Sequence, residues 1–472
     1  MTWRLKGEDR MLRFPLVLLA CLVNLNIAPA QTASQPNQSD SSCRIEAANY
    51  KGWSAQQLSN RWVKLEVVPQ NGGRLMQVIF AGHPFLFVNP EFEGKYLPPD
   101  PSHWFNYGGD KLWLLPEGND DEQHWVGNSD LIDDGPYAFR KVSEGKECEI
   151  ELTGPADPQT GIQIRRTIHL DSDSPRIHFH ATMQNATGHA VEWSMQSVSQ
   201  YDTADPANPQ RINHSFFAFT PANPSSSYLN RYHVRFGPAE NPAVFVRDDD
   251  LFALHYVHMA AELWLDSTAG WLAVVDGESR YAMVERFRYE KSEAYPGRAS
   301  VIFWMNGPET RLNSEGEPSL TSGGDGSPRY LEAEINSPLV QLRPGETRDL
   351  EADWFPTRAA GEFHGVEDAG IVVHPLRATR AEGGHIRLSG SFGVFFTGRL
   401  VAHLYNEHGA LVGTMPLAQV DPAELVAIET DLTPPAKTSR VSLHLEDGKG
   451  MDRGSLQEVK VEEVPAGAVE AH

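Results

Sequence analysis

The chain has 472 residues, of which 40% are hydrophobic, and a formal net charge of -23. Such an acidic chain is repelled by nucleic-acid phosphates and by anionic membrane surfaces, which excludes nucleic acid as a partner. Its three cysteines are too few for a disulfide-built scaffold or a cysteine metal site.

The N-terminal segment, residues 1–30, has the pattern of an export signal. Arg13 precedes an apolar run at residues 14–23, and Ala28-Pro29-Ala30 forms a small-x-small cleavage site. The run is too short to span a bilayer, and no later segment is longer, so we expect no transmembrane segment in the mature chain. A periplasmic or secreted protein cleaved after Ala30 is expected. The alternative is a lipoprotein that carries its lipid on Cys21.

A tail rich in Ser, Gln and Asn follows and is expected to be a disordered tether over residues 31–45. Cys43 and Cys148 remain after cleavage. In an oxidising compartment they could form one disulfide between the tether and the first domain, or stay as two separate thiols.

Short alternating or β-branched segments dominate the rest of the chain. They include residues 63–68, 75–80, 149–152, 162–170, 176–183, 272–275, 301–305 and 330–335. Gly, Pro, Asn and Asp clusters separate them, in a chain with 33 prolines and 39 glycines. This pattern predicts an all-β fold of antiparallel sheets. Residues 253–265 are the exception, where a short helix is expected.

The sequence predicts two folded domains with a boundary near residues 356–367. The first covers residues 46–357. Beyond the boundary, at residues 365–465, a run of about a hundred residues with short strands fits a small C-terminal β-sandwich.

Residues 104–113, with the sequence WFNYGGDKLW, combine aromatic faces with a carboxylate, an amide and an ammonium group. Flat apolar faces beside a few fixed polar groups suit a sugar ring, which has apolar C–H faces and a rim of hydroxyls. The other interpretation is a strand–turn–strand with core tryptophans and a surface ion pair. Arg74 follows a Gly72-Gly73 hairpin and is either a pocket residue or an ordinary surface arginine.

Three pairs of titratable residues could carry chemistry. Glu332 and Glu334 are two apart in a strand, so they share one face, and paired acids can serve acid–base reactions. His178 and His180 also share a strand face, but no third ligand is obvious nearby. His255 and His258 form a second weak pair, with Glu262 four residues on, a suggestive spacing on a helix, but the H-E-x-x-H pattern is absent. We therefore predict no metal and no cofactor. No G-x-S-x-G, Walker or G-x-G-x-x-G motif is present.

The order of several short motifs is informative. The Gly-Gly hairpin comes first, then N-Y-G-G-D-K-L-W at 106–113, L-E-A-E at 331–334 and L-R-P-G-E at 342–346. This order resembles the galactose mutarotase-like, or aldose 1-epimerase-like, superfamily over about residues 50–357, and is most like a bacterial branch of it. The resemblance implies a large antiparallel supersandwich with a sugar cleft on a concave sheet.

In that superfamily a glutamate takes the proton of the anomeric hydroxyl while a histidine protonates the ring oxygen. The resemblance places Glu332 at the position of the catalytic base, or Glu334 if the alignment is shifted by two residues. The family's two histidine motifs fall on residues 132–135 and 199–202, and neither contains a histidine. His103 and His124 lie near the first of them and are the candidate replacements.

These observations predict an exported carbohydrate-binding protein with weak or no catalysis. An active aldose 1-epimerase-type enzyme is the alternative, and a structural or accessory envelope protein is the second. The expected site brings together one catalytic residue, Glu332, and the substrate-binding residues Arg74, Asn106, Asp110, Lys111 and Trp113. Arg74 and Lys111 would add charge-assisted donors suited to an acidic sugar.

Overall fold

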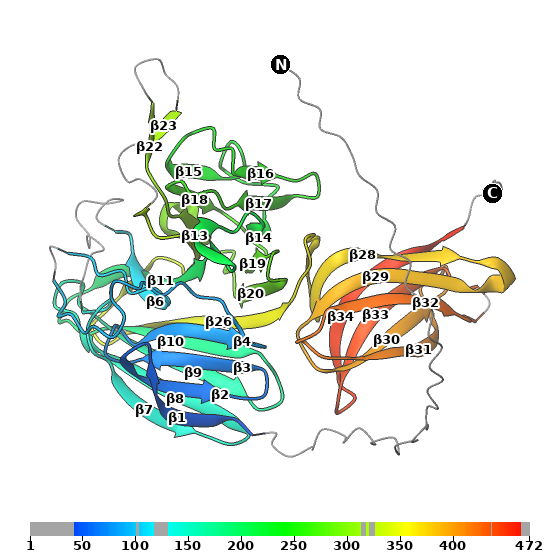
Figure 1. Ribbon diagram of the computed structural model, residues 1–472, viewed down its shortest axis with the longest axis horizontal. Coiled ribbons are helices and arrows are strands. Elements are labelled where there is room, and N and C mark those ends of the chain that lie inside the picture. Colours follow the sequence, from blue (N-terminus) through cyan, green and yellow to red (C-terminus); the bar gives the residue numbers. More distant parts are fainter. Residues whose placement is uncertain are drawn as a thin grey trace, which may run out of the picture. The chain divides into compact units, whose positions relative to one another are not determined.

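The protein is described by a computed structural model that covers residues 42–100, 103–117, 131–312, 318–320, 326–435 and 437–463. Regular structure there consists of strands and two short 3-10 helices, η1 (Pro296–Arg298) and η3 (Glu382–Gly384), as Figure 1 shows. The prediction of an all-β fold is confirmed. The predicted signal at 1–30, Cys21, and residues 31–41 of the predicted tether lie outside the described residues. In the described part, no helix is long and apolar enough to cross a membrane.

The first large sheet has twelve strands. Its main path runs, in spatial order, β1 (Arg44–Tyr50), β2 (Trp53–Ser59), β3 (Val63–Val68), β4 (Arg74–Phe80), β6 (Asp110–Leu115), β11 (Val191–Asp202), β24 (Tyr330–Asn336), β21 (Val301–Met305), β18 (Ala261–Leu265) and β15 (His233–Phe236). Two short strands join it at the side, β5 (His83–Pro84) on β4 and β25 (Val340–Leu342) on β11. All of its strand pairs are antiparallel.

The second large sheet has ten strands. Its order is β16 (Val244–Val246), β17 (Leu251–His255), β14 (Phe216–Pro221), β19 (Trp271–Asp276), β20 (Tyr281–Phe287), β26 (Thr347–Arg358), β10 (Ile177–Asn185), β9 (Ile162–Asp171), β8 (Glu147–Ala156) and β7 (Ala138–Ser143). Alternate residues of both sheets form one apolar core, with Leu114 and Ala333 from the first and Ile164 and Met283 from the second. Two sheets that share a core in this way form a β-sandwich.

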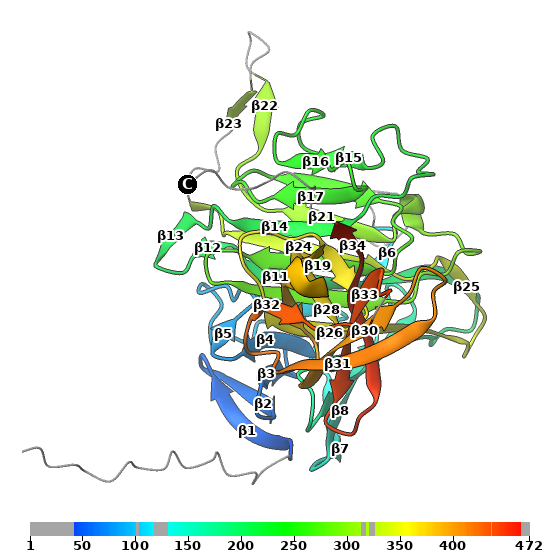
Figure 2. The ribbon, with the colours of Figure 1, turned by 90° about the vertical axis from the view of Figure 1, so that its right-hand side faces the viewer.

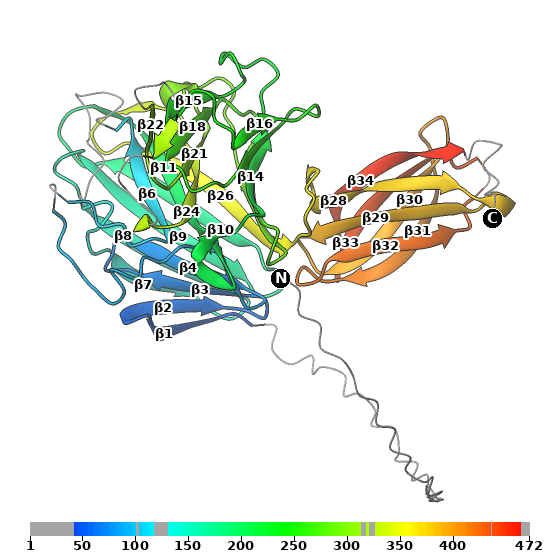
Figure 3. The same cartoon turned by 45° about the horizontal axis from the view of Figure 1, so that its top comes forward.

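The C-terminal strands form a sheet of eight strands, coloured yellow to red in Figures 1 and 3. Its path is β31 (Leu411–Val420), β30 (Gly398–Tyr405), β33 (Arg440–Asp447), β34 (Asp452–Glu463), β28 (Gly370–Arg380), β29 (Ile386–Val394) and β32 (Val426–Leu432), with β27 (Gly365–Glu367) beside β28. It encloses its own apolar cluster, which includes Leu388, Phe392, Leu400 and Leu443. Two small ladders complete the strands, β12 (Ala204–Asp205) with β13 (Asn208–Ile212) and β22 (Thr310–Leu312) with β23 (Pro318–Leu320).

Ordered structure begins earlier than the sequence predicts. Arg44 and Ile45, expected in the tether, lie in β1, and Cys43 forms a β-bridge with Gly145. Cys43 and Cys148 are joined by a disulfide with a Cα–Cα distance of 5.8 Å. Of the two alternatives for these cysteines, the structure therefore contains the disulfide and not two separate thiols. The disulfide joins this segment to β8 and the ladder joins β1 to β2, so ordered structure starts before the predicted domain start at residue 46.

The expected helix at residues 253–265 is wrong. The segment contains the end of β17 and all of β18, separated by a turn. In β18, Ala261, Leu263 and Leu265 join the core while Glu262 and Trp264 lie on the other face, which is the two-residue period of a strand. Pairing with β15 and β21 satisfies the backbone and overrides the weak local helical pattern.

The predicted domain boundary falls between β26, which ends at Arg358, and β27, which begins at Gly365. Residues of the two predicted domains share one further apolar cluster, with Phe219 and Phe355 on one side of the boundary and Ile371 and Phe395 on the other. Independent folding of the two domains therefore stays a prediction.

Candidate functional site

A cleft of about 610 Å³ lies on the face of the twelve-stranded sheet that does not contact the ten-stranded sheet. Its lining comes from six adjacent strands, β6, β11, β24, β21, β18 and β15, together with loop residues such as Trp104. The neighbouring positions of β11, β24 and β21 can be followed in Figure 2. The volume is within the range of small-molecule sites, about 300–1,000 Å³.

Strand register explains why residues far apart in sequence meet on the floor of the cleft. Directly opposed residues share a face, and one row across five strands reads Gln200, Glu332, Trp304, Glu262 and Phe236. Every neighbour in this row is a paired position in an antiparallel ladder. The sheet thus places an indole, Trp304, between two carboxylates.

Four of the described residues that line the cleft are tryptophans. Trp104 and Trp113 stand at one side, with ring centroids 6.1 Å apart in an edge-to-face arrangement, and Trp264 and Trp304 stand at the other. The indole Nε1 of Trp264 donates to Glu262 Oε1 at 2.5 Å, which fixes that ring. Aromatic faces on two sides of a polar floor are suited to a ring with apolar C–H faces.

Lys111 and Glu332 are brought together at the base of the cleft, as the sequence predicts. Lys111 Nζ lies 3.9 Å from Glu332 Oε1, and its ammonium sits 3.9 Å from the ring centroid of Trp113 and 4.7 Å from that of Trp104. Lys111 is only 1% exposed and makes no hydrogen bond to a described residue, so these ring faces and Glu332 stabilise its charge.

Glu332 is also held by β11, which lies between β6 and β24 in the sheet. Gln200 Nε2 donates to its Oε1 at 2.6 Å. Burial raises the pKa of Glu332, while Lys111 and the Gln200 hydrogen bond counteract that rise. A carboxyl whose pKa is raised by burial can accept or donate a proton nearer to neutral pH than an exposed one.

Arg74 lies beneath the cleft and not on its surface. Its side chain is fully buried, and its guanidinium donates to Asp133 Oδ1 at 2.5 Å and to the backbone carbonyl of Gly108 at 2.9 Å. Asp133 in turn accepts a hydrogen bond at 3.1 Å from the indole Nε1 of Trp104 on its other oxygen. Burial opposes ionisation of Asp133, but Arg74 and Lys111 lower its pKa. Arg74 is therefore a positioning residue that acts on Trp104 through Asp133, which corrects its expected role as a ligand contact.

Asn106 is likewise a supporting residue. It is 8% exposed, its side-chain oxygen accepts from the backbone of Gly108 at 3.2 Å, and its side chain also contacts the Tyr330 hydroxyl. Gly108 and Gly109 have φ of 89° and 75°, where a side chain would collide with the Phe87 and Leu75 carbonyls. These glycines let the chain approach neighbouring backbone, not a ligand as the sequence suggests.

Asp110 does not belong to the cleft. It pairs with Leu75 and Ser199, whose side chains lie on the core face, and it is fully buried. Arg166 of β9 forms an ion pair with it, and the hydroxyl of Ser199 donates to it at 3.1 Å. Burial raises the pKa of Asp110, and Arg166 counteracts this. The predicted convergence of all six residues is wrong for Asp110, because it precedes Lys111 by one residue and successive side chains of a strand alternate between faces.

Several lining residues were missed by sequence reasoning. Trp264, Trp304 and Tyr330 were not predicted as site residues, and Glu262 was considered only as a neighbour of His255 and His258 on an expected helix. A signal was present in the two-residue spacing of Glu262 with Trp264 and of Tyr330 with Glu332, which places each pair on one face. Asp133 lies in a loop. No local sequence pattern predicts its contacts with Arg74 and Trp104.

The histidines do not supply a catalytic acid or a metal site in the described structure. No histidine is among the described residues that line the cleft, and His103 pairs instead with Asp100 at 3.0 Å. His178 faces Asp353 at 2.9 Å. Among the described residues, no three His, Cys, Asp or Glu side chains form a group that could hold a metal ion. His124 lies outside the described residues.

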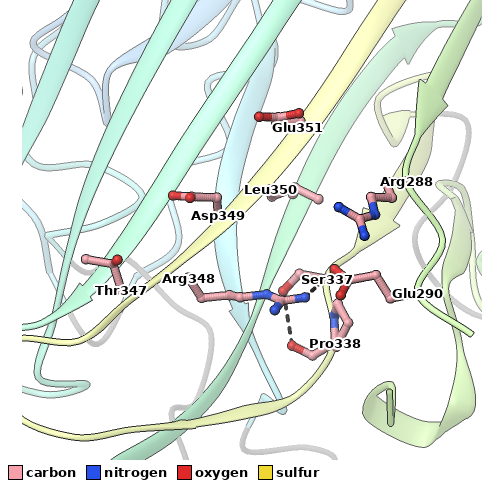
Figure 4. Close-up of a pocket in the computed structure, with 9 residues that line it drawn as sticks. All are labelled: Arg288, Glu290, Ser337, Pro338, Thr347, Arg348, Asp349, Leu350 and Glu351. Atoms are coloured by element: carbon pink, nitrogen blue, oxygen red, sulfur yellow. Dashed lines mark hydrogen bonds and ion pairs between the residues drawn. The ribbon is translucent and has the colours of Figure 1, made fainter. Parts of the chain in front are cut away.

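A second pocket, of about 340 Å³, lies along β26 and is shown in Figure 4. Within its charged lining, Arg348 forms an ion pair with Glu290. Ser337 and Pro338 form part of its wall, and the hydroxyl of Ser337 donates to the carbonyl oxygen of Pro338 at 3.3 Å. None of the predicted site residues lines this pocket, and it has no aromatic surface.

Comparisons with known proteins find similarity in structure alone. No protein-family model and no curated protein sequence matches the chain. Its fold is similar to that of galactose mutarotase-like proteins. One such protein, from Clostridium acetobutylicum, is 10% identical with a TM-score of 0.42, and the match covers 68% of this chain and 100% of that one. A galactose mutarotase related enzyme from Lactobacillus acidophilus is 11% identical with a TM-score of 0.39, over 64% and 96% of the two chains.

A TPR-domain containing protein from Parabacteroides distasonis is 14% identical with a TM-score of 0.44. That match covers 67% of this chain and 48% of the other, so this chain spans about half of that protein's length. All these identities are low, and the matches concern the fold alone.

Proposed function

We propose that the protein is an exported carbohydrate-binding protein whose binding site is the cleft on the twelve-stranded sheet, with weak or no catalysis. The observation that carries this proposal is the row in which Trp304 lies between Glu332 and Glu262, with Trp113 and Trp104 across the cleft. Indole faces stack on the C–H faces of a pyranose, and carboxylates accept hydrogen bonds from its hydroxyls.

Rigid positioning supports binding. Two carboxylates on the floor are each held by a glutamine of β11, since Gln200 donates to Glu332 and Gln196 donates to Glu334. Groups whose geometry is set before the ligand arrives lose little entropy when it binds. The cleft therefore needs no rearrangement to present its stacking faces and acceptors together.

Catalysis by an aldose 1-epimerase mechanism needs a base and an acid on opposite sides of the sugar. Glu332 is the candidate base, since it lines the cleft and burial raises its pKa. The described lining contains no histidine to serve as the acid, which favours a binding protein over an enzyme. The epimerase alternative is tested by following the anomer ratio of freshly dissolved aldoses by NMR, with and without protein. Acceleration that Glu332→Gln abolishes would establish the enzyme.

Export rests on the N-terminal pattern and is supported by the Cys43–Cys148 disulfide, because such bridges persist mainly in oxidising compartments. N-terminal sequencing of the secreted or periplasmic protein should begin at Gln31. A lipid on Cys21 would instead establish the lipoprotein alternative.

A glycan-array screen of residues 31–472 tests carbohydrate binding, followed by titration of the best ligand. Phe236 and Phe245 form a matched pair, since they are 40% and 45% exposed and only Phe236 lines the cleft. Phe236→Ala and Trp304→Ala should each weaken binding by about tenfold through lost stacking. Phe245→Ala should leave it unchanged. Binding to no glycan would favour a structural or accessory envelope protein.

A further inference from the structure

The charges that line the cleft are unevenly distributed. Five glutamates contribute to the described lining, at positions 117, 262, 309, 332 and 334, against one arginine, Arg235. The nearest other cation, Lys111, is 1% exposed and lies against Glu332. The surface offered to a ligand is therefore strongly acidic.

Glu332 and Glu334 lie in the floor of the cleft, and each uses only one carboxylate oxygen in a hydrogen bond to a described residue. Glu332 and Glu334 are each only 6% exposed. Gln200 donates to Oε1 of Glu332, and Gln196 donates to Oε2 of Glu334. The second oxygen of each has no hydrogen-bond partner among the described residues, and both side chains line the cleft. Neither of these oxygens is among the fully buried atoms that lack a partner, so both are open to the cleft and can accept a hydrogen bond from a ligand.

The carboxylates of the cleft also oppose one another's ionisation. Burial raises the pKa of Glu334 well above its ordinary value, and the nearby carboxylates Glu332, Glu262 and Glu117 raise it further. A cation placed among these groups would offset both the repulsion and the desolvation. Lys111 opposes the rise but is too deep in the sheet to face a ligand.

Aromatic rings complete the environment that a cation prefers. Trp304 lies between Glu332 and Glu262 in register, and Trp264 follows Glu262 by two residues on the same face. An ammonium group near an indole face gains cation–π attraction, and adjacent carboxylates add charge-assisted hydrogen bonds. We propose, on the basis of the proposed carbohydrate site, that the cleft selects a sugar with a free protonated amino group over its neutral N-acetylated counterpart.

An acidic sugar, which the sequence suggested, fits this lining poorly. The two cations on which that expectation rested are both occupied, Arg74 by Asp133 and Lys111 by Glu332 and the tryptophan rings. A uronate carboxylate in the cleft would face Glu332 and Glu334 instead, and like charges at short range repel.

The test compares the β-1,4-linked tetramer of glucosamine with that of N-acetylglucosamine, by calorimetric titration of residues 31–472 at pH 6. The glucosamine tetramer should bind at least about tenfold more tightly, equivalent to one charge-assisted contact. Glu334→Gln should reduce this preference to within about threefold, because the amide keeps the shape of the side chain but cannot become the carboxylate that a bound ammonium group stabilises. Glu351→Gln, which changes an exposed glutamate on β26, should leave the preference intact.

Equal or tighter binding of the N-acetylated tetramer by the unaltered protein would overturn the inference while leaving carbohydrate binding in place. A preference that survives Glu334→Gln and Glu332→Gln together would overturn the assignment to this cleft. Failure of both tetramers, with no other glycan bound on an array, would instead remove the proposed function itself.

Discussion

Asp110 and Lys111 are neighbours in sequence, yet their side chains lie on opposite faces of the twelve-stranded sheet. Asp110 points into the core, where it pairs with Arg166, and Lys111 lies at the base of the cleft beside Glu332. One residue of offset in a strand thus separates a group that stabilises the sandwich from a group that shapes the site. The two can be distinguished by experiment.

Asp110→Ala should lower the free energy of unfolding by about 3–5 kcal/mol, because it leaves the Arg166 guanidinium buried without its partner. Urea denaturation followed by fluorescence measures this. Adding Arg166→Met should restore part of the loss, since the uncompensated charge is then gone. An Asp110→Ala protein of normal stability that no longer binds sugar would contradict the core assignment.

Glu285 should make stability fall as pH rises. Burial raises its pKa from 4.5 to about 8, while its hydrogen bond from Tyr201 at 2.5 Å lowers it. Between pH 4.5 and 8 the unfolded chain loses this proton before the folded protein does, so ionisation favours unfolding by up to about 1.4 kcal/mol per pH unit.

Glu285→Gln removes this titration. The difference in unfolding free energy between the variant and the unaltered protein should therefore grow in favour of the variant from pH 5 to pH 8, and level off above pH 8. Urea denaturation at a series of pH values provides the comparison. A difference that is constant across this range would show that Glu285 does not titrate as described.

The disulfide should contribute strongly to stability. Cys43 and Cys148 are separated by 105 positions, and closing a loop of that size in the unfolded chain is worth about 4–5 kcal/mol in the chain-entropy account. The double variant Cys43→Ala, Cys148→Ala should melt well below the oxidised protein in calorimetry. It should match the unaltered protein treated with reductant. Equal melting of the oxidised and reduced proteins would show that the bridge does not constrain unfolding.

Residues 42–358 and 365–463 should each fold when produced separately, because each contains an apolar cluster of its own. Each fragment should also melt below the whole chain, since separation exposes shared contacts such as Phe355 with Phe395, whose ring centroids are 4.6 Å apart. Circular dichroism during heating measures both effects. A fragment without a cooperative transition would show that the boundary does not separate independent domains.

The sequence alone was sufficient for the fold class and for part of the site. Period-two alternation in segments such as 162–170 and 330–335 is a local property, so it predicted strands without knowledge of their partners. For the same reason Glu332 and Glu334 could be assigned to one face. The positive φ of Gly72 and Gly73 also follows from a short-range signal, a Gly-Gly turn between two strands.

Tertiary structure decided which face became the cleft and which residues of six strands meet there. Asp110 and Lys111 were both predicted to lie in the site. The alternation of residues along a strand does not indicate which of its two faces the second sheet will cover. Trp304 and Glu262 became neighbours of Glu332 only through the register of β18, β21 and β24. Register depends on pairings between segments tens of residues apart, and these are set by burial of the whole core and not by any local sequence signal.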